Sequence, residues 1–201
     1  MTTSGVFGAK YCSDCAAVLR REIPLGDERM RDVCPACGTI HYQNPKVVAG
    51  AIPEWQGRVL LCRRAIEPRL GLWTLPAGFM ENDETTIEAA ARETREEAAA
   101  DITIDALYGL FNLPYINQVY VMFRGRLRAP EFGPGTESLE VALFAEADIP
   151  WEDLAFPVVS ETLKLYFADR SRGSFGIYTG DLVRTAGGVE LRYLGAGDRK
   201  A

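Results

Sequence analysis

The sequence predicts a mixed α/β domain whose strands and helices share one core, preceded by a small module that a metal ion holds together. Three observations predict this class. Two Cys-x-x-Cys pairs stand near the N-terminus, apolar or alternating runs of strand length follow them, and a capped segment rich in Ala, Glu and Arg lies among those runs. With 201 residues, 47% of them hydrophobic, the chain is long enough for one good core plus the small module.

The N-terminal module, expected at residues 1–43, depends on four cysteines. Cys12 and Cys15 form one pair, and Cys34 and Cys37 form a second after eighteen intervening residues. Four thiolates on two such knuckles suit a tetrahedral zinc ion with no open position, so the zinc is expected to be structural. Two disulfides or an iron–sulfur centre are the alternatives. A ribbon this short buries little apolar surface, so metal binding would supply its folding energy.

The main domain, expected at residues 44–170, begins with two strands over 46–52 and 58–64. Gln56-Gly57 marks the turn between them. A helix is then expected from Thr85 to Ala98. Good helix formers dominate that segment, and Thr85 with Glu88 fits the Ser/Thr-x-x-Glu capping box.

Further strand-like runs and a second helical segment follow the first helix. They are expected at residues 102–111, 118–127 and 139–144 for the strands and 159–168 for the helix. A C-terminal extension, residues 171–201, carries two short strand-like pieces at 175–179 and 189–194. The glycines between these two pieces indicate a hairpin.

Three acidic side chains share one face of the first helix. Glu93, Glu96 and Glu97 stand at i, i+3 and i+4, within about 100° of arc. Like charges at these spacings each cost an isolated helix roughly 0.2–0.5 kcal/mol, so the arrangement is unfavourable unless a cation lies between them. Magnesium prefers a few carboxylates together with waters and phosphate oxygens. A metal site for phosphate chemistry is therefore expected, and an exposed helix laced by Arg92 ion pairs is the alternative.

Composition and charge argue against several function classes. No apolar run approaches a membrane span, and the net charge of −6 argues against nucleic acid as a partner. His41 is the single histidine and no nucleophile-elbow sequence is present, which argues against a serine or cysteine triad. Because no basic segment followed by an apolar stretch stands at the N-terminus, a cytoplasmic protein with reduced thiols is expected.

Residues 78–100 resemble the Nudix box, G-x5-E-x7-R-E-U-x-E-E-x-G-U, in which U is a bulky aliphatic residue. The glycine and every charged position match. The sequence departs from the pattern at Thr94, Ala99 and Ala100, which are packing positions. The resemblance covers about residues 44–170 and implies an αβα sandwich with a mixed sheet.

The same resemblance assigns roles to the matching residues. It implies that Glu93, Glu96 and Glu97 bind magnesium or manganese. Gly78, Glu84 and Arg92 would hold the loop against the helix. Together with Glu93, Glu96 and Glu97, they are the matched glycine and charged positions of the box.

A general base is also implied, because a glutamate would deprotonate the attacking water. Glu97 is the first candidate and Glu96 the second. Some members of the family take the base from a later loop, where Glu137 and Glu140 are the candidates. For both of these, a solvated surface glutamate is the alternative.

The substrate class follows from a wider resemblance. The four-cysteine ribbon and the segments 42–45, 71–78 and 134–140 are similar to zinc-ribbon Nudix enzymes related to FAD and ADP-ribose pyrophosphatases. This implies hydrolysis of a small-molecule nucleotide with release of AMP. An NADH pyrophosphatase or an NAD-cap RNA decapping enzyme is the second hypothesis, although residues 110–115 replace the NADH pyrophosphatase signature. A non-catalytic zinc-ribbon binding module is the alternative of another class.

Substrate contacts are expected from the strand that leads toward the box. Arg63 and Arg64 end that strand, and one of them should point into the site because strand side chains alternate; a solvated surface position is the alternative for either. Glu140 is a further candidate. Tyr42, Tyr115, Tyr120 and Phe156 are candidates to stack on a base, and a place in the core or at the rim is the alternative for each. A homodimer is left open by the sequence.

Overall fold

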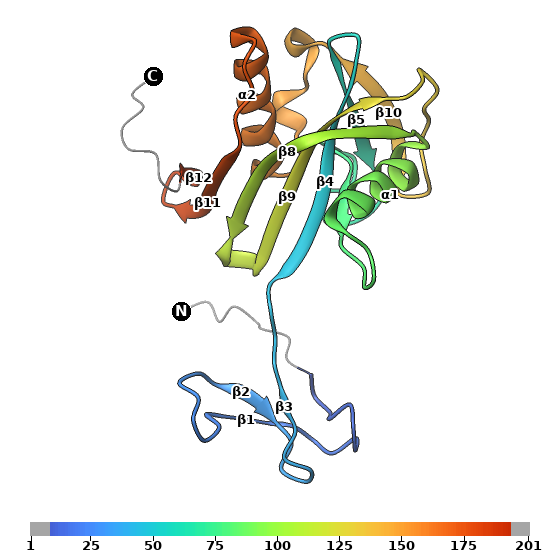
Figure 1. Cartoon of the computed structure of the whole chain (residues 1–201). Helices are drawn as coiled ribbons and strands as arrows, with labels where there is room; N and C mark the ends of the chain where they lie inside the picture. The colour runs from blue at the N-terminus through green and yellow to red at the C-terminus, as the bar shows by residue number, and fades with distance from the viewer. Residues whose placement is uncertain (1–8, 194–201) are drawn as a thin grey trace. The chain divides into compact units, whose positions relative to one another are not determined.

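The structure, a computed structural model, describes residues 9–193, which form two compact modules that divide after Pro45 (Figure 1). The ends of the expected ribbon module and of the expected C-terminal extension lie outside the described residues. Each module is described by itself below. None of the helices in residues 9–193 combines the length and apolar character that crossing a membrane requires.

The N-terminal module is a three-stranded antiparallel sheet joined by cysteine-bearing turns. Its strands are β1 (Arg20–Glu22), β2 (Arg31–Val33) and β3 (Ile40–His41), in the order β1-β2-β3. Two tight turns shape it. The amide of Ala16 donates to the Cys12 carbonyl at 3.0 Å, and the amide of Gly38 donates to the Cys34 carbonyl at 2.9 Å. These turns bring the thiols of each pair to the same side.

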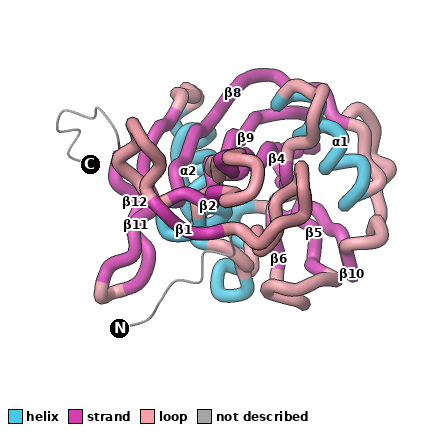
Figure 2. The backbone as a smooth tube through the Cα atoms, turned by 90° about the horizontal axis from the view of Figure 1, so that it is seen from below, coloured by secondary structure: helices cyan, strands magenta, loops and turns pink. Residues whose placement is uncertain are grey.

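The second module is built on one large mixed sheet. Its strands are β4 (Lys46–Trp55), β5 (Arg58–Arg64), β6 (Trp73–Thr74), β7 (Ala77–Phe79), β8 (Ile102–Leu113), β9 (Gln118–Leu127), β10 (Ser138–Phe144), β11 (Tyr178–Thr185) and β12 (Gly188–Tyr193). The main path is β10-β5-β4-β9-β8-β11-β12, with β6 beside β5 and β7 beside β4. Only β4–β9 and β8–β11 are parallel pairs among these described strands. Figure 2 shows β11 and β12 at one edge and β10 at the other.

Two helices cover opposite faces of this sheet, and three short 3₁₀ turns lie in the loops. The helices are α1 (Thr86–Ala98) and α2 (Pro157–Arg172), and the turns are η1 (Pro114–Ile116), η2 (Glu146–Asp148) and η3 (Trp151–Asp153). Alternation along β4 sets the two faces. Ala49 and Ala51 pack with α1, whereas Ile52 belongs to the larger core under α2. The αβα sandwich with a mixed sheet is therefore confirmed.

The long predicted elements are present, and the turn between β4 and β5 forms as expected. Gln56 and Gly57 both have positive φ, 49° and 78°, which suits a two-residue hairpin turn. The short strands β6 and β7 were not predicted. These two strands matter for the site. β5 pairs with β4 only near their common turn, and β7 pairs with residues 48–50 of β4 farther along. β4 and β5 therefore separate at the point where the loop to α1 begins.

The C-terminal hairpin belongs to the main sheet, because β11 runs parallel to β8 and pairs with it from Tyr178↔Gly109 onward. The first predicted piece, 175–179, shares only residues 178 and 179 with β11. The chain around the start of β11 is held by α2 as well. The amide of Gly176 and the hydroxyl of Tyr178 donate to the buried carboxylate of Asp169 at 3.1 and 2.6 Å.

Candidate active site

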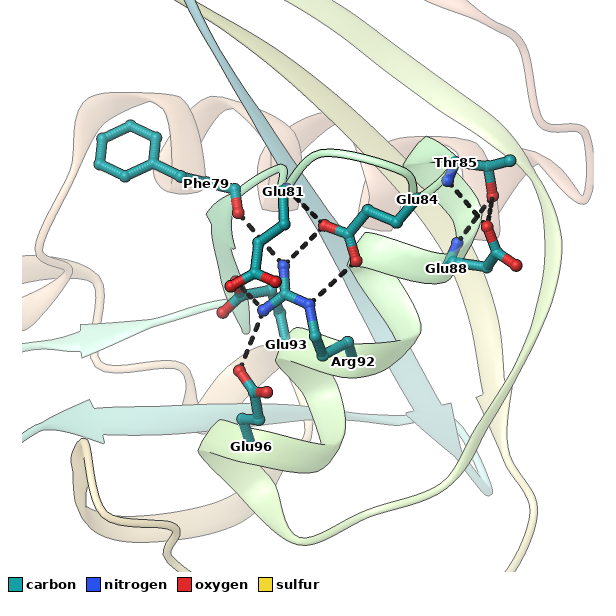
Figure 3. A network of polar contacts seen from close by, with 8 residues as sticks. All are labelled: Phe79, Glu81, Glu84, Thr85, Glu88, Arg92, Glu93 and Glu96. Carbon is teal, nitrogen blue, oxygen red and sulfur yellow. Dashed lines mark hydrogen bonds and ion pairs between the residues drawn. The ribbon is translucent and has the colours of Figure 1, made fainter.

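The loop after β7 is tied to α1 by one arginine (Figure 3). Arg92 donates two hydrogen bonds to Glu84, at 3.0 and 2.8 Å, and a third to the carbonyl of Phe79 at 3.1 Å. Glu84 also accepts from the Glu81 amide at 2.6 Å, and these donors lower the pKa of Glu84 to about 2, with Arg92 as the largest cause. Paired hydrogen bonds of this kind fix the loop geometry.

Capping residues fix both ends of α1. At the start, the Glu88 amide donates to Thr85 Oγ1 at 3.2 Å and the Thr85 amide donates to Glu88 Oε2 at 2.8 Å, which is the predicted capping box. At the end, Ala99 adopts the left-handed conformation with φ 47° and ψ 32°. Glycine is the usual residue there, and the last glycine of the Nudix pattern falls on this position. Alanine therefore bears strain that a glycine would avoid.

Two glycines lie against this helix: a side chain at Gly135 would meet backbone, and one at Gly78 would displace the carboxylate of Glu93. A Cβ at Gly78 would lie 2.2 Å from Oε1 of Glu93, and one at Gly135 would lie 1.7 Å from the backbone oxygen of Glu96. The Gly135 amide donates to the Glu97 carbonyl at 3.1 Å. The loop before β10 therefore packs directly against the C-terminal turn of α1.

The three box glutamates differ in their surroundings. Glu93 and Glu97 are buried, with 9% and 7% of their surface exposed, whereas the side chain of Glu96 is 58% exposed. Arg92 Nη1 donates to Glu93 Oε1 at 2.7 Å and to Glu96 Oε2 at 3.0 Å, so its guanidinium lies between them. In residues 9–193, the only group of three or more His, Cys, Asp or Glu side chains with ligand atoms all within 4.8 Å is the cysteine group. The carboxylates thus share a face without converging on one point.

Glu97 has a buried oxygen whose hydrogen-bonding capacity is not satisfied. Its Oε2 is buried and has no hydrogen-bond partner within the described structure. Burial, reinforced by Glu93, raises the pKa of Glu97 to about 8, although a backbone hydrogen bond from Ala77 and the nearby Arg64 work against this rise. Burial also raises the pKa of Glu93. A buried carboxylate oxygen without a donor, beside a second buried carboxylate, fits a divalent cation.

These carboxylates open into a cleft of about 1080 Å³. All three box glutamates and Arg92 line it, together with Glu137 from the loop before β10. Aromatic side chains form another part of the wall, namely Tyr115, Tyr120 and Phe156. The cleft therefore combines an acidic part, where cations would bind, with flat apolar surfaces on which a ring can stack.

The two strand-end arginines point in different directions, as alternation along β5 requires. Arg64 lines the cleft, with its Cζ 5.2 Å from the centre of the Phe156 ring and its Nε donating to the Pro68 carbonyl at 2.9 Å. Arg63 lies away from it and pairs with Glu140 at 3.6 Å. Glu140 thus forms an ion pair outside the cleft, whereas the side chain of Glu137 lines the cleft.

The cleft also contains residues that the sequence did not single out. Arg184 and Val189 line it from the C-terminal hairpin, and Arg69 and Thr136 line it from loops. No local pattern places Arg184 or Val189 at the cleft, because their hairpin joins it through strands far apart in the chain. The pairing of β11 with β8 was the missing information.

In the N-terminal module the four cysteine sulfurs converge. All are free thiols, and Sγ–Sγ distances are 3.6 Å for Cys12–Cys37, 3.4 Å for Cys15–Cys34 and 3.6 Å for Cys15–Cys37. A disulfide needs about 2.05 Å, so the disulfide alternative does not describe this structure. Tetrahedral Zn–S bonds of about 2.3 Å place sulfurs about 3.8 Å apart, so the set fits a zinc ion.

Comparison with known proteins agrees with this architecture. The profile of the NUDIX domain matches residues 44–164, and the profile described as Nudix N-terminal, a zinc ribbon, matches residues 10–43. A crystal structure of a NUDIX hydrolase from Nitrosomonas europaea is 53% identical with a TM-score of 0.85, covering 87% of this chain and 99% of that one.

Two curated relatives carry named activities. The chain is 26% identical over 164 residues to the NAD-capped RNA hydrolase NudC of Stutzerimonas stutzeri, covering 80% of this chain and 57% of that protein. It is 36% identical over 73 residues to the ADP-ribose pyrophosphatase of Methanocaldococcus jannaschii, covering 36% of this chain and 43% of that protein. The chain thus spans little more than half the length of the first relative and less of the second. With a NUDIX profile over most of its length and the box residues gathered at one cleft, this chain belongs to the Nudix hydrolase family.

Proposed function

We propose that this protein is a divalent-metal-dependent hydrolase of the pyrophosphate bond in a nucleoside diphosphate linked to another moiety, of the FAD or ADP-ribose type, and that it releases AMP. One observation carries the proposal. The buried, unpartnered oxygen of Glu97 lies beside buried Glu93 at a large cleft whose walls also bear arginine and aromatic side chains. Such a cleft suits the parts of a nucleotide diphosphate.

Glu93, Glu96 and Glu97 would hold magnesium or manganese in this proposal. When bound, such an ion polarises a bridging phosphate and lowers the pKa of a bound water. Arg92 holds Glu93 and Glu96 by hydrogen bonds in the present arrangement, so Glu96, the exposed one, would turn away from Arg92. Glu84 keeps its two bonds to Arg92 and so preserves the loop.

Glu97 is the proposed general base, and Glu137 is its competitor. Both side chains line the cleft, and Glu137 is near enough to Glu93 and Glu97 to raise the pKa of each. Glu96 ranks behind Glu97, because its exposed carboxylate is held by Arg92. A base at either position would take the proton of the attacking water.

Arg64 is the proposed contact for the pyrophosphate, and Tyr120 or Phe156 the proposed contact for a base. An arginine held against an aromatic ring keeps its planar fork ordered, which suits paired contacts to phosphate oxygens. Support for the substrate class comes from the ADP-ribose pyrophosphatase among the relatives. NAD-type substrates are the second candidate, because NudC matches over 80% of this chain.

Zinc is the proposed ion of the N-terminal module, with Cys12, Cys15, Cys34 and Cys37 as its ligands and no catalytic role. The four sulfurs form a closed set, which leaves no open position for a substrate.

A substrate panel with matched variants tests the enzymatic proposal. FAD, ADP-ribose, NADH, NAD and diadenosine compounds are incubated with magnesium or manganese, and released AMP is measured. Glu97→Gln keeps the size of the side chain and should lower kcat by a factor of about 100 or more, since base catalysis is worth 10²–10⁴. Glu137→Gln is measured in parallel to rank the two candidate bases.

Glu152→Gln, an exposed position outside the cleft lining, is the control and should leave turnover unchanged. Full activity of Glu97→Gln would remove Glu97 from the mechanism. Absence of AMP from every compound in the panel, with either metal, would favour a non-catalytic binding module.

A further inference from the structure

One end of the cleft is built from a segment that the NUDIX profile does not include. The profile ends at residue 164, and the hairpin of β11 and β12 begins at residue 178. From this hairpin Arg184 and Val189 line the cleft, where they join Leu113, Tyr115 and Ile116 from the end of β8 and from η1. The hairpin therefore contributes to the wall of the cleft as well as extending the sheet.

This hairpin end lies far from the carboxylates. The path across the sheet from β7, which carries Gly78 of the box, runs β7-β4-β9-β8-β11. Four steps of about 4.8 Å each place β11 about 19 Å from β7. Gly78 and Arg184 both line the same cleft, so the cleft extends over this width. A substrate that fills it reaches well beyond its pyrophosphate.

Arg184 lies over an aromatic ring at that end. Its Cζ lies 4.8 Å from the centre of the Tyr115 ring, a cation–π distance. The residue is exposed, and within residues 9–193 it forms no ion pair with a carboxylate. The guanidinium thus lies over Tyr115, and among the described residues it has no acidic partner to withdraw it from the cleft.

The neighbours of Arg184 indicate what kind of group it would meet. Leu113, Ile116 and Val189 line the cleft with apolar side chains, and Gln118, which pairs with Leu113, adds one amide. A guanidinium plane stacks on planar heteroaromatic rings, and apolar side chains add contact area to such a stack. The surroundings therefore favour a ring over an isolated anion.

We propose that Arg184 and Tyr115 form a subsite for a planar heteroaromatic ring of the substrate, at the end of the cleft away from the carboxylates. The proposal rests on the proposed function in that it takes the cleft to bind a nucleotide. The ring is either the adenine of the AMP half or the flavin or nicotinamide of the other half. Both share the same stacking chemistry, and the experiment separates them.

The test compares variants of the full-length protein. Arg184→Ala removes the stack, and Arg184→Lys keeps the charge but not the plane. Tyr115→Leu keeps apolar volume but removes the ring that supports the guanidinium. Arg192→Ala is the control, because Arg192 lies on the same hairpin, pairs with Glu190 and is not part of the cleft lining.

Steady-state kinetics give the first readout. Arg184→Ala, Arg184→Lys and Tyr115→Leu should each raise KM by about tenfold, the scale of a partly desolvated cation–π contact, and leave kcat unchanged because the reacting bond is remote. An increase for FAD and NAD, but not for ADP-ribose, assigns the second ring to the subsite. An increase that includes ADP-ribose assigns adenine. Full recovery of KM in Arg184→Lys would overturn the stacking proposal, as would an equal loss in Arg192→Ala.

Equilibrium binding gives a second readout that needs no turnover. Titrations use AMP, FMN and ribose 5-phosphate as probes. Arg184→Ala should weaken the ring-bearing probe that occupies the subsite by about tenfold and leave ribose 5-phosphate unaffected. If no compound is hydrolysed by the unaltered protein, the proposed function fails while this binding difference still tests the subsite. Equal binding of every probe by Arg184→Ala and the unaltered protein would overturn the inference alone.

Discussion

The two proposed metal sites of this protein are prepared to different degrees. Four cysteine sulfurs of the N-terminal module already lie within 4.8 Å of one another, whereas Glu93, Glu96 and Glu97 share a helix face without converging. Backbone turns set the thiol positions. The carboxylates are set by helix spacing and by Arg92, which donates to Glu93 and Glu96.

This difference separates the proposed structural site from the proposed catalytic site by how their ligands are held. Thiol ligands that converge through short turns form a closed set, and closing it is part of folding. The carboxylates of α1 are held by the helix spacing and by Arg92, which donates to two of them. In the proposed function their site opens to the cleft, through which ions and substrate would exchange.

The largest effect expected from this comparison is loss of the N-terminal fold on zinc removal. Structural zinc contributes an apparent free energy on the order of 10 kcal/mol in small modules. Cys34→Ser, or a chelator that preserves thiols, should therefore abolish protection of the amides in residues 9–45, as measured by hydrogen exchange. Amides of the main sheet should keep their protection, because that sheet has its own core.

Magnesium or manganese removal is the matched control in the same exchange experiment. It should stop turnover and leave the amides of both modules protected. If the amides of the N-terminal module stayed protected after proven loss of zinc, the proposal that zinc holds this module together would be wrong.

A smaller effect is expected at the carboxylates, in the dependence of stability on pH. Glu97 has a folded pKa raised to about 8, mainly by burial, above the ordinary value of 4.5. A raised pKa means that the folded state binds the proton more tightly than the unfolded state. The contribution of Glu97 to the free energy of unfolding is therefore fully present below pH 4.5 and is lost as the pH rises through 8. In the absence of magnesium and manganese, and with zinc retained, the melting temperature should therefore fall as the pH rises over this range.

Glu97→Gln supplies the control for this pH dependence, since glutamine cannot ionise. The variant should melt at a higher temperature than the unaltered protein near pH 8 without metal, although its turnover is low. Added magnesium should raise the melting temperature of the unaltered protein more than that of the variant. If the melting temperatures of the two proteins depended on pH in the same way, ionisation of Glu97 would not be the cause of the loss of stability.

Much of the fold could be predicted because long periodic segments carry their own signal. The capping box at Thr85, the strand of residues 118–127 and the Gln56-Gly57 turn all form where the sequence predicts them. Strands of two and three residues, such as β6 and β7, are too short to show a period. Their positions depend on what β4 and β5 leave unpaired.

The candidate site could be predicted in part for a similar reason. Helical spacing places the three glutamates on one face, but it does not fix where the guanidinium of Arg92 comes to lie. Alternation indicates that Arg63 and Arg64 diverge, and the pairing partner Glu140 decides which of them leaves the cleft. Arg184 joins the cleft only through the parallel pairing of β11 with β8, which no local pattern encodes.

The smallest effect concerns the end of the carboxylate helix. Ala99 is exposed and left-handed with φ 47°, so Ala99→Gly removes a conformational cost of about 1 kcal/mol. Part of this gain is offset, because glycine also increases the entropy of the unfolded chain. A rise of a few degrees in the melting temperature of the main module is expected, with no change in the exchange of residues 9–45. Ala186→Gly, in the exposed turn after β11, is the comparison substitution, since Ala186 has no positive φ and should gain nothing. A loss of stability in Ala99→Gly would mean that the left-handed end of α1 is not strained, and the departure of this chain from the Nudix pattern at that position would then carry no cost.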